Sequence, residues 1–140
     1  MIDDSTTLDE ICRAHGVLAC YLFGSRADEG KAVLEGRKVP AEGSDLDVGV
    51  FFEAGTLPAH RVLAALQIAF EDHLAPLRID LVPLDRVDPL FQFSAISGHR
   101  VASLEPSRVE RMELRIMRSA AELLPVQRGL ERDLFGASSR

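Results

Sequence analysis

Apolar and polar positions along this chain form two kinds of pattern. Short continuous apolar runs are typical of buried strands, whereas apolar residues three and four positions apart are typical of helices with one buried face. The continuous runs predict strands at 17–23, 46–52, 78–84 and 101–104. The spaced pattern predicts helices at 5–15, 60–74, 88–97 and 106–123. Strands and helices are interspersed, which predicts an α/β (α+β) fold.

Several residues mark where these elements begin and end. A Ser-Thr-Thr sequence at 5–7 precedes the first helix and Gly16 follows it, as expected of a capped helix that ends at a glycine. Pro76 stops the second helix. Pro83 predicts that the third strand ends at an edge or rim of the sheet, because proline cannot donate a hydrogen bond to a neighbouring strand.

The last two helices contain apolar residues that we expect to point inward. In the helix at 88–97 these residues are Leu90, Phe91 and Ile96. In the helix that begins at Pro106 they are Val109, Met112, Ile116, Ala120 and Leu123. The tail at 125–140 is only partly periodic, so we expect it to be helical at first and then frayed.

Residues 26–44 interrupt the pattern. Glycine, proline and charged residues are frequent there, and no periodicity persists. We expect a brief helical turn after Ser25 and then a mobile loop. A loop of this length within a compact domain is usually functional or disordered, and a solvated insertion without a role is an equally good interpretation.

Length and composition are those of an ordinary globular protein. The 140 residues, 46% hydrophobic and 27% charged, are expected to form one domain over 1–140 with a core at about 5–124. No apolar run reaches the length of a membrane span and the acidic N-terminus does not resemble a signal peptide, so we expect no membrane association and a cytoplasmic location. Cys12 and Cys20 are interpreted as reduced structural thiols.

Charge is distributed unevenly around a net value of −6. Residues 1–98 carry a net charge of −8, whereas residues 99–140 carry +2. An acidic body argues against duplex nucleic acid as a partner and is compatible with a site that recruits divalent cations. Helical spacing aligns four arginines of the last helix in one stripe: Arg108, Arg111, Arg115 and Arg118. The stripe is either a contact surface for an acidic partner or a nucleotide, or a solvated face, which is the commoner case.

Three aspartates border or interrupt apolar strands. Asp45 and Asp47 stand two residues apart at the start of one strand, so their side chains are expected on one face. Paired carboxylates repel unless a cation lies between them, and such hard oxygen ligands suit Mg²⁺. Asp80 interrupts another apolar strand, where a carboxylate is costly unless paired or bound to a metal, so it is a candidate third acid. The alternatives are a local turn at Asp45 and Asp47 and an ion pair of Asp80 with a neighbouring arginine.

Gly24 and Ser25 directly follow the first predicted strand. A glycine lets a phosphate approach the backbone, and a serine offers a hydroxyl and an N–H group at the expected start of a helix, where anions are favoured. A plain helix cap is the alternative for Ser25, and both roles are compatible. A phosphate-binding turn beside paired metal-binding carboxylates is typical of phosphoryl or nucleotidyl transfer.

A resemblance to a known family rests on three segments: Phe23-Gly24-Ser25-Arg26-Ala27, Ser44-Asp45-Leu46-Asp47 and Ile79-Asp80-Leu81-Val82. Together they resemble the motifs of the minimal nucleotidyltransferase (MNT) family. That family has the DNA polymerase β-like palm, so the resemblance implies a small mixed β-sheet flanked by helices. It implies that ATP binds together with Mg²⁺, expected as two ions, and that the nucleotide contacts Gly24, Ser25, Arg26 and Ser44. It further implies that the metal ions bind Asp45, Asp47 and Asp80, with Asp80 also acting as base or orienting the attacking hydroxyl.

The resemblance also implies a reaction and a partner. An acceptor oxygen displaces pyrophosphate from the α-phosphate and receives AMP. Many family members are antitoxins that add AMP to a tyrosine of a HEPN-domain ribonuclease toxin. We therefore expect a nucleotidyltransferase that acts on such a toxin, within a hetero-complex or as a homo-oligomer. Transfer to a small hydroxyl compound, and a non-catalytic antitoxin that acts by occlusion, are the alternatives.

The chain departs from the family pattern in the loop after Ser25. The segment before Asp45 is longer than usual, its glycine is displaced to Gly30, and Asp28 stands where a basic residue is common. Contacts to the triphosphate therefore do not carry over directly from the family. Four histidines lack metal-ligand spacing and are interpreted as surface or capping residues: His15, His60, His73 and His99.

Overall fold

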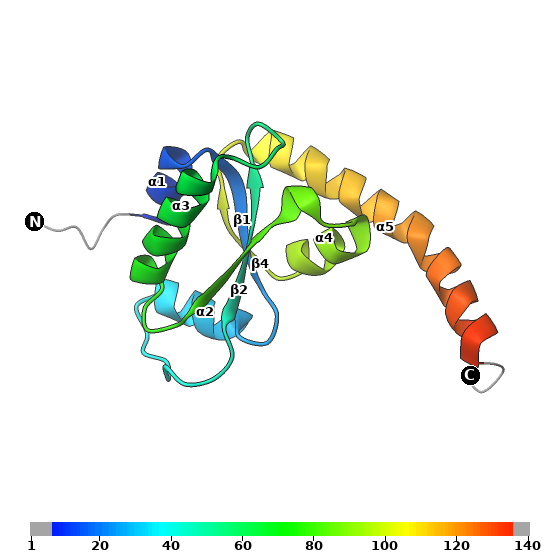
Figure 1. Cartoon of the computed structure of the whole chain (residues 1–140), viewed down its shortest axis with the longest axis horizontal. Helices are drawn as coiled ribbons and strands as arrows, with labels where there is room; N and C mark the ends of the chain where they lie inside the picture. The colour runs from blue at the N-terminus through cyan, green and yellow to red at the C-terminus, as the bar shows by residue number, and fades with distance from the viewer. Residues whose placement is uncertain (1–6, 136–140) are drawn as a thin grey trace, which may run out of the picture.

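The computed structural model describes residues 7–135 and contains a four-stranded β-sheet with helices on both faces (Figure 1). The elements follow the chain as α1 (Leu8–Ala14), β1 (Val17–Phe23), α2 (Ala27–Leu34), β2 (Leu46–Phe52), α3 (His60–His73), β3 (Ile79–Pro83), the 3₁₀ turn η1 (Leu84–Arg86), α4 (Pro89–Ile96), β4 (His99–Ser103) and α5 (Pro106–Phe135). The predicted α/β class is confirmed.

The sheet is mixed and has the strand order β3-β2-β1-β4. β1 runs antiparallel to β2 and to β4, whereas β2 and β3 are parallel. A parallel pair needs a crossover connection, and α3 lies in the segment that joins β2 to β3. β3 is an edge strand, so Pro83 at its end lies at an edge, as its missing N–H group predicts.

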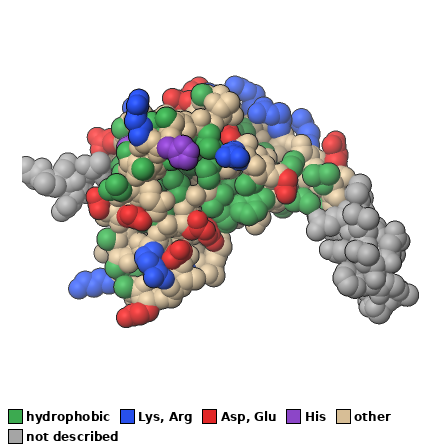
Figure 2. Space-filling view, in the orientation of Figure 1, with side chains coloured by type: hydrophobic (Ala, Val, Ile, Leu, Met, Phe, Trp, Pro, Cys, Tyr) green, Lys and Arg blue, Asp and Glu red, His purple; other side chains and the backbone are tan. Residues whose placement is uncertain are grey.

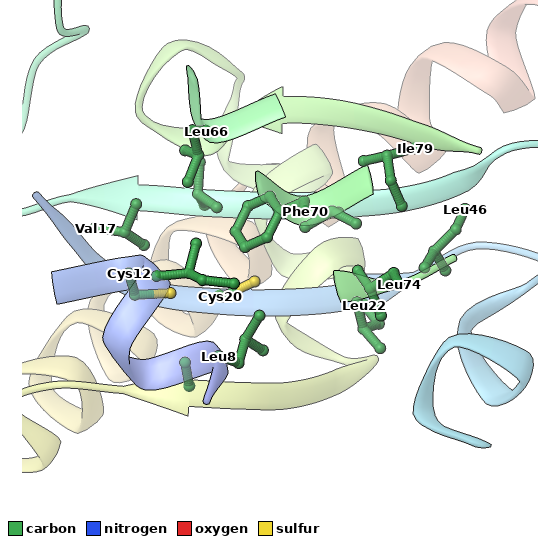
Figure 3. Close-up of a cluster of buried hydrophobic side chains, with 14 of the residues drawn as sticks. Leu8, Cys12, Val17, Cys20, Leu22, Leu46, Leu66, Phe70, Leu74 and Ile79 are labelled. Carbon is green, nitrogen blue, oxygen red and sulfur yellow. The ribbon is translucent and has the colours of Figure 1, made fainter. Parts of the chain in front are cut away.

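One face of the sheet is covered by α1 and α3, which form the larger apolar cluster with the strands (Figure 3). Leu66 and Phe70 of α3 are completely buried in this cluster. Cys12 of α1 and Cys20 of β1 belong to it as well, and both are free thiols. Their burial in an apolar layer agrees with the interpretation of these cysteines as structural.

The opposite face of the sheet is covered by α4 and α5. The cluster on this side includes Tyr21 and Phe51 from the strands and Val109 and Ile116 from α5. Because both faces are covered, every residue of β1 is buried. This explains why β1 reads as a continuous apolar run rather than as an alternation of apolar and polar residues.

A partly buried polar contact ties α5 to the sheet. The hydroxyl of Tyr21 donates a hydrogen bond of 2.5 Å to Oε2 of Glu113, and Nη1 of Arg100 lies 3.1 Å from both carboxylate oxygens of Glu113. Burial raises the pKa of Tyr21 well above its usual value, and Glu113 raises it further. Tyr21 therefore stays protonated, and the first part of α5 is fixed to β1 and β4.

Most predicted bounds are confirmed. β1 and β2 match the predicted 17–23 and 46–52, and α3 ends one residue before the predicted position. At the start of α1, Oγ1 of Thr7 accepts a hydrogen bond from the Glu10 N–H, while Oε1 of Glu10 accepts one from the Thr7 N–H. This reciprocal pair satisfies two N–H groups that a helix start leaves free.

The expectation that Phe91 and Leu123 point inward was wrong. Phe91 of α4 is 41% exposed and Leu123 of α5 is 38% exposed. The Phe91 ring instead packs edge-on against Phe23, with the ring centroids 5.8 Å apart. Ala95 takes the buried position on α4, because its small side chain lets the helix approach the sheet closely.

α5 is longer than predicted. It continues as one helix from Pro106 to Phe135, so the tail that was expected to begin at 125 is helical as far as Phe135. Its far end extends beyond the rest of the molecule (Figure 1). The predicted frayed end at 136–140 lies outside the described residues. Neither α5 nor any other helix within 7–135 is long and apolar enough to cross a membrane.

Candidate active site

Two of the predicted aspartates lie side by side near one end of the sheet. Asp47 of β2 and Asp80 of β3 are register partners in the parallel pair, so both side chains point to the same face. On the other side, Asp47 is paired with Phe23, the last residue of β1. Asp45 is exposed and lies just before β2. The three acids therefore gather next to the point where the chain leaves β1.

Gly24 lies directly against one of these carboxylates. Its φ of +80° is in the left-handed region that favours glycine, and a Cβ at this position would stand 2.2 Å from Oδ2 of Asp47. Any side chain would therefore collide with the carboxylate. The absence of a side chain leaves the backbone of the turn accessible next to Asp47, as a phosphate site requires.

Ser25 and Ser44 lie at the two ends of the segment that joins β1 to β2, and their side chains are in contact. Their Oγ atoms are 3.2 Å apart, and both residues are exposed. α2 begins at Ala27, so Ser25 lies immediately before the Arg26 cap of that helix. Two hydroxyl groups thus stand at the N-terminal end of α2, where the helix dipole favours an anion.

Arg26 is the residue whose position differs most from the sequence-based expectation. We expected it to contact the nucleotide, but its side chain is only 6% exposed. Its Nε donates to Oε1 of Glu29 at 2.5 Å, Nη1 to the Ser44 carbonyl at 3.1 Å and Nη2 to the Pro40 carbonyl at 2.7 Å. The guanidinium is therefore directed into the protein, where it holds the loop against the start of α2.

The segment expected to be a brief turn and a mobile loop contains a helix of two turns, α2. Gly30 lies on its buried side, where a Cβ would stand 2.8 Å from Cδ2 of Leu46 and 3.0 Å from Cδ1 of Leu22. Gly30 therefore serves the close packing of α2 on β1 and β2 and does not belong to the phosphate turn. The remaining loop, residues 35–45, is held by Arg26.

The electrostatics of the acids favour a bound cation. Burial raises the pKa of Asp47, and the neighbouring carboxylates of Asp80 and then Asp45 raise it further. A cation between these groups would remove the repulsion and favour the ionised forms.

Arg78 supplies the nearest positive charge. Its Nε lies 3.1 Å from Oδ1 of Asp45, and its Nη2 donates a hydrogen bond of 3.0 Å to the Gly43 carbonyl. The sequence left open an ion pair between Asp80 and a neighbouring arginine. Over the described part of the chain, the ion pair is formed by Asp45 instead, and Asp80 has none.

The acids do not form a ready-made cage for a metal. Within the residues that the structure describes, no group of three acidic, His or Cys side chains could hold a metal ion by itself. Mg²⁺, however, usually binds one or two carboxylates and completes its shell with water and substrate phosphates. Asp47 and Asp80 supply such a pair of oxygen ligands. The residues present therefore fit a Mg²⁺ ion that arrives together with a nucleotide.

A contact that the sequence did not reveal lies beside the phosphate turn. Nε2 of His99 in β4 lies 2.7 Å from Oδ1 of Asp28 in the first turn of α2. The carboxylate that occurs in place of a common basic residue is therefore bound by an imidazole from a distant segment. No sequence signal could have found this pair, because 71 positions separate the two residues. Of the other histidines, His15 caps the end of α1, as predicted: its Nδ1 donates a hydrogen bond of 2.7 Å to the Ile11 carbonyl.

The arginine stripe on α5 is distant in sequence from these acids. Figure 2 shows Lys and Arg side chains gathered over the first half of α5. Arg108 donates a hydrogen bond of 2.7 Å to the Glu53 carbonyl. Arg115 lines a cavity of about 270 Å³ together with Asp85, Gln92 and Ser119. These contacts show how Arg108 and Arg115 are held, and they test neither interpretation of the stripe, a docking surface or a solvated face.

Comparison with protein families gives one match. The family model described as "Polymerase beta, Nucleotidyltransferase" matches residues 6–106. The matched range contains the turn after β1, the three aspartates and all four strands. Among curated proteins, none matches this sequence at a significant level.

Solved structures with a similar fold include proteins of toxin–antitoxin systems. A mutant of the MntA–HpeT toxin–antitoxin aligns with a TM-score of 0.66 and 13% identity, over 96% of this chain and 100% of that chain. A Shewanella oneidensis complex of a tri-AMPylated HEPN toxin with an MNT antitoxin aligns with a TM-score of 0.62 and 14% identity, over 91% and 92%. A toxin–antitoxin structure with AMP-PNP aligns with a TM-score of 0.64 and 14% identity, over 96% and 100%.

Proposed function

The chain belongs to the polymerase beta nucleotidyltransferase family, and we propose that it transfers AMP from ATP to a hydroxyl group of a partner protein. Family membership makes it a nucleotidyltransferase, and the predicted polymerase β-like fold is confirmed. The observation that carries the proposal is that Gly24, directly after β1, lies against Asp47 of β2, whose register partner is Asp80 of β3. This arrangement supports a phosphate site on the β1 side of a carboxylate pair.

The nucleotide would bind with its phosphates at the turn after β1. Gly24 would let the phosphates approach the backbone beside Asp47, and the hydroxyls of Ser25 and Ser44 would donate hydrogen bonds to them. Arg26 would act as a positioning residue that holds the loop beside the phosphates, because its donors are directed to Glu29 and to the loop carbonyls. This role replaces the direct nucleotide contact expected for Arg26.

Transfer requires that the acceptor attack in line with the leaving pyrophosphate. With the pyrophosphate at Gly24 and Ser25, the acceptor hydroxyl would enter from the side of β3. Asp80 on that side would orient this hydroxyl or accept its proton as the new oxygen–phosphorus bond forms and the bond to pyrophosphate breaks. Mg²⁺, expected as two ions held by Asp45, Asp47 and Asp80, would neutralise the charge on the reacting phosphate.

The proposed acceptor is a tyrosine of a HEPN-type toxin. Support comes from the fold shared with the MNT antitoxin that was solved together with a tri-AMPylated HEPN toxin. A second source of support is the exposed position of the acids, since Asp45 and Asp80 are both accessible to a large substrate. The chain would then act as the antitoxin of a toxin–antitoxin pair.

Labelling with ATP carrying an α-phosphate label tests the proposal. The wild-type chain is incubated with this ATP, Mg²⁺ and extract of the host cell, and the label is followed on protein. We expect label on one discrete protein band. Label on small molecules only would favour a small hydroxyl acceptor, and absence of any label despite nucleotide binding would favour neutralisation by occlusion.

A double variant tests the assignment of the acids. Asp45→Asn with Asp47→Asn should abolish labelling while the protein stays folded, since the amides remove charge without changing size. The matched control is Asp9→Asn with Asp72→Asn, two exposed aspartates of α1 and α3. This control has the same change in net charge and should label like the wild type. Full labelling by the active-site variant would refute the assignment.

A further inference from the structure

The carboxylate of Asp45 is already bound to a cationic group of the chain. Nε of Arg78 approaches Oδ1 of Asp45 to 3.1 Å, while Nη2 of the same guanidinium is held by the Gly43 carbonyl at 3.0 Å. The backbone of Arg78 is fixed as well, because its carbonyl accepts a hydrogen bond of 2.8 Å from the Leu46 N–H. Arg78 is thus held at the rim of the acid group by contacts that do not involve Asp45.

The ion pair is exposed and therefore easily exchanged. The side chain of Arg78 is 72% exposed and that of Asp45 is 49% exposed. Pairs as accessible as this one contribute little to stability, since water competes for both charges. A divalent cation competes for the same carboxylate oxygen with twice the charge, so it can replace the guanidinium.

We propose that Arg78 is a built-in counter-ion that a divalent cation must displace from Asp45, so that Arg78 weakens binding of the free metal ion and favours its entry together with a nucleotide. The inference rests on the proposed function, because it takes Asp45 as a metal ligand. It adds a role for a residue outside the predicted site.

The physical reason is that Arg78 and the metal ion compete for Asp45, and that the nucleotide supplies additional oxygen ligands for the ion. Without nucleotide, an incoming ion meets Asp47 and Asp80 but finds Asp45 occupied. With nucleotide, phosphate oxygens at Gly24 and Ser25 complete the coordination shell and compensate for the displaced guanidinium. The released side chain stays near the acids through its bond to the Gly43 carbonyl.

Two variants with the same change in charge test the inference. Arg78→Gln removes the counter-ion, and Arg86→Gln removes a positive charge from an exposed position in η1 that has no ion pair with the acids in the described structure. Binding of Mn²⁺ alone is measured by isothermal titration calorimetry for both variants and the wild type. We expect Arg78→Gln to bind Mn²⁺ about two- to fivefold more tightly than Arg86→Gln, the range that an exposed pair allows.

The direction of the effect separates this role from a structural one. A residue that merely supports the loop would weaken Mn²⁺ binding when it is replaced, so equal or weaker binding by Arg78→Gln would overturn the inference. A second titration in the presence of AMP-PNP distinguishes the two proposals. If the wild type binds no Mn²⁺ even with AMP-PNP, the proposed function fails and this inference fails with it. If the wild type binds Mn²⁺ with AMP-PNP but Arg78→Gln does not bind the free ion more tightly, this inference alone fails.

Discussion

Asp47 and Asp80 stand opposite each other on two parallel strands, and within 7–124 neither carboxylate has an ion-pair partner. Burial and this neighbour raise the pKa of Asp47, so the folded protein binds the Asp47 proton more tightly than the unfolded chain does. Ionised Asp47 therefore lowers the stability of the folded protein, at the place where we propose that a cation binds. Its cost should be measurable in the protein without metal.

The first prediction concerns pH. The contribution of Asp47 to stability is fully present below the usual pKa of an aspartate and is lost as the pH rises through the raised pKa. Asp47→Asn cannot ionise, so its free energy of unfolding should rise relative to wild type as the pH increases from about 4 to 6. Urea unfolding in EDTA at several pH values measures this difference. A difference that stays constant over the range would contradict the prediction.

Gly24 provides a second prediction with a close control. Gly24→Ala places a methyl group 2.2 Å from Oδ2 of Asp47, so nucleotide binding should weaken about tenfold or more. Gly36→Ala has the same backbone requirement, with φ of +84°, but meets no atom within 4 Å. It should lose about 1 kcal/mol of stability and keep its affinity. Titration with AMP-PNP and Mg²⁺ separates the two effects, and equal losses of affinity would argue against a phosphate site at Gly24.

Arg26 should contribute to the free energy of unfolding. Arg26→Gln leaves the Pro40 and Ser44 carbonyls without their donors, so it should lower the free energy of unfolding by about 2–4 kcal/mol. Arg37→Gln is the control, because Arg37 is exposed and, among the residues whose side chains are described, pairs only with Glu35 on the surface. It should cost less than about 1 kcal/mol. Urea unfolding compares the two variants, and similar stabilities would show that the loop does not depend on Arg26.

Tyr21 tests how α5 is attached. Tyr21→Phe removes the hydrogen bond to Glu113 but leaves the Arg100 contact with that carboxylate. The expected loss is about 1–2 kcal/mol, because the partly buried carboxylate keeps one partner. Glu113→Gln should cost a similar amount, and the double variant should cost less than the sum, since both changes act on the same contact between Tyr21 and Glu113. Additive losses would show that the two side chains act independently.

The sequence was most informative where burial alone decides structure. β1 and β2 were predicted with correct bounds because both faces of these strands are covered, so the apolar run is as long as the strand. The acids and Gly24 were proposed for a related reason. Their residue types are unusual within or directly beside apolar strands, and strand register brings Asp47 and Asp80 together.

The sequence was least informative where distant segments decide structure. The burial of Arg26 depends on a loop that returns to α2 only in the folded protein, and the contacts of Asp28 with His99 and of Asp45 with Arg78 are equally non-local. α2 was expected to be brief because Gly30 and the charged residues around it are not typical of a helix interior. Packing against Leu22 and Leu46 outweighs that preference.

The close contact of Gly30 with Leu22 and Leu46 couples evolution of the core to evolution of the site. A larger residue at position 30 would push α2 outward and carry Ser25 away from Asp47, unless a smaller residue at Leu22 or Leu46 made room for it. These three positions should therefore covary among relatives that keep activity. Mutations that look like simple repacking of the interior would then tune how the enzyme holds its nucleotide.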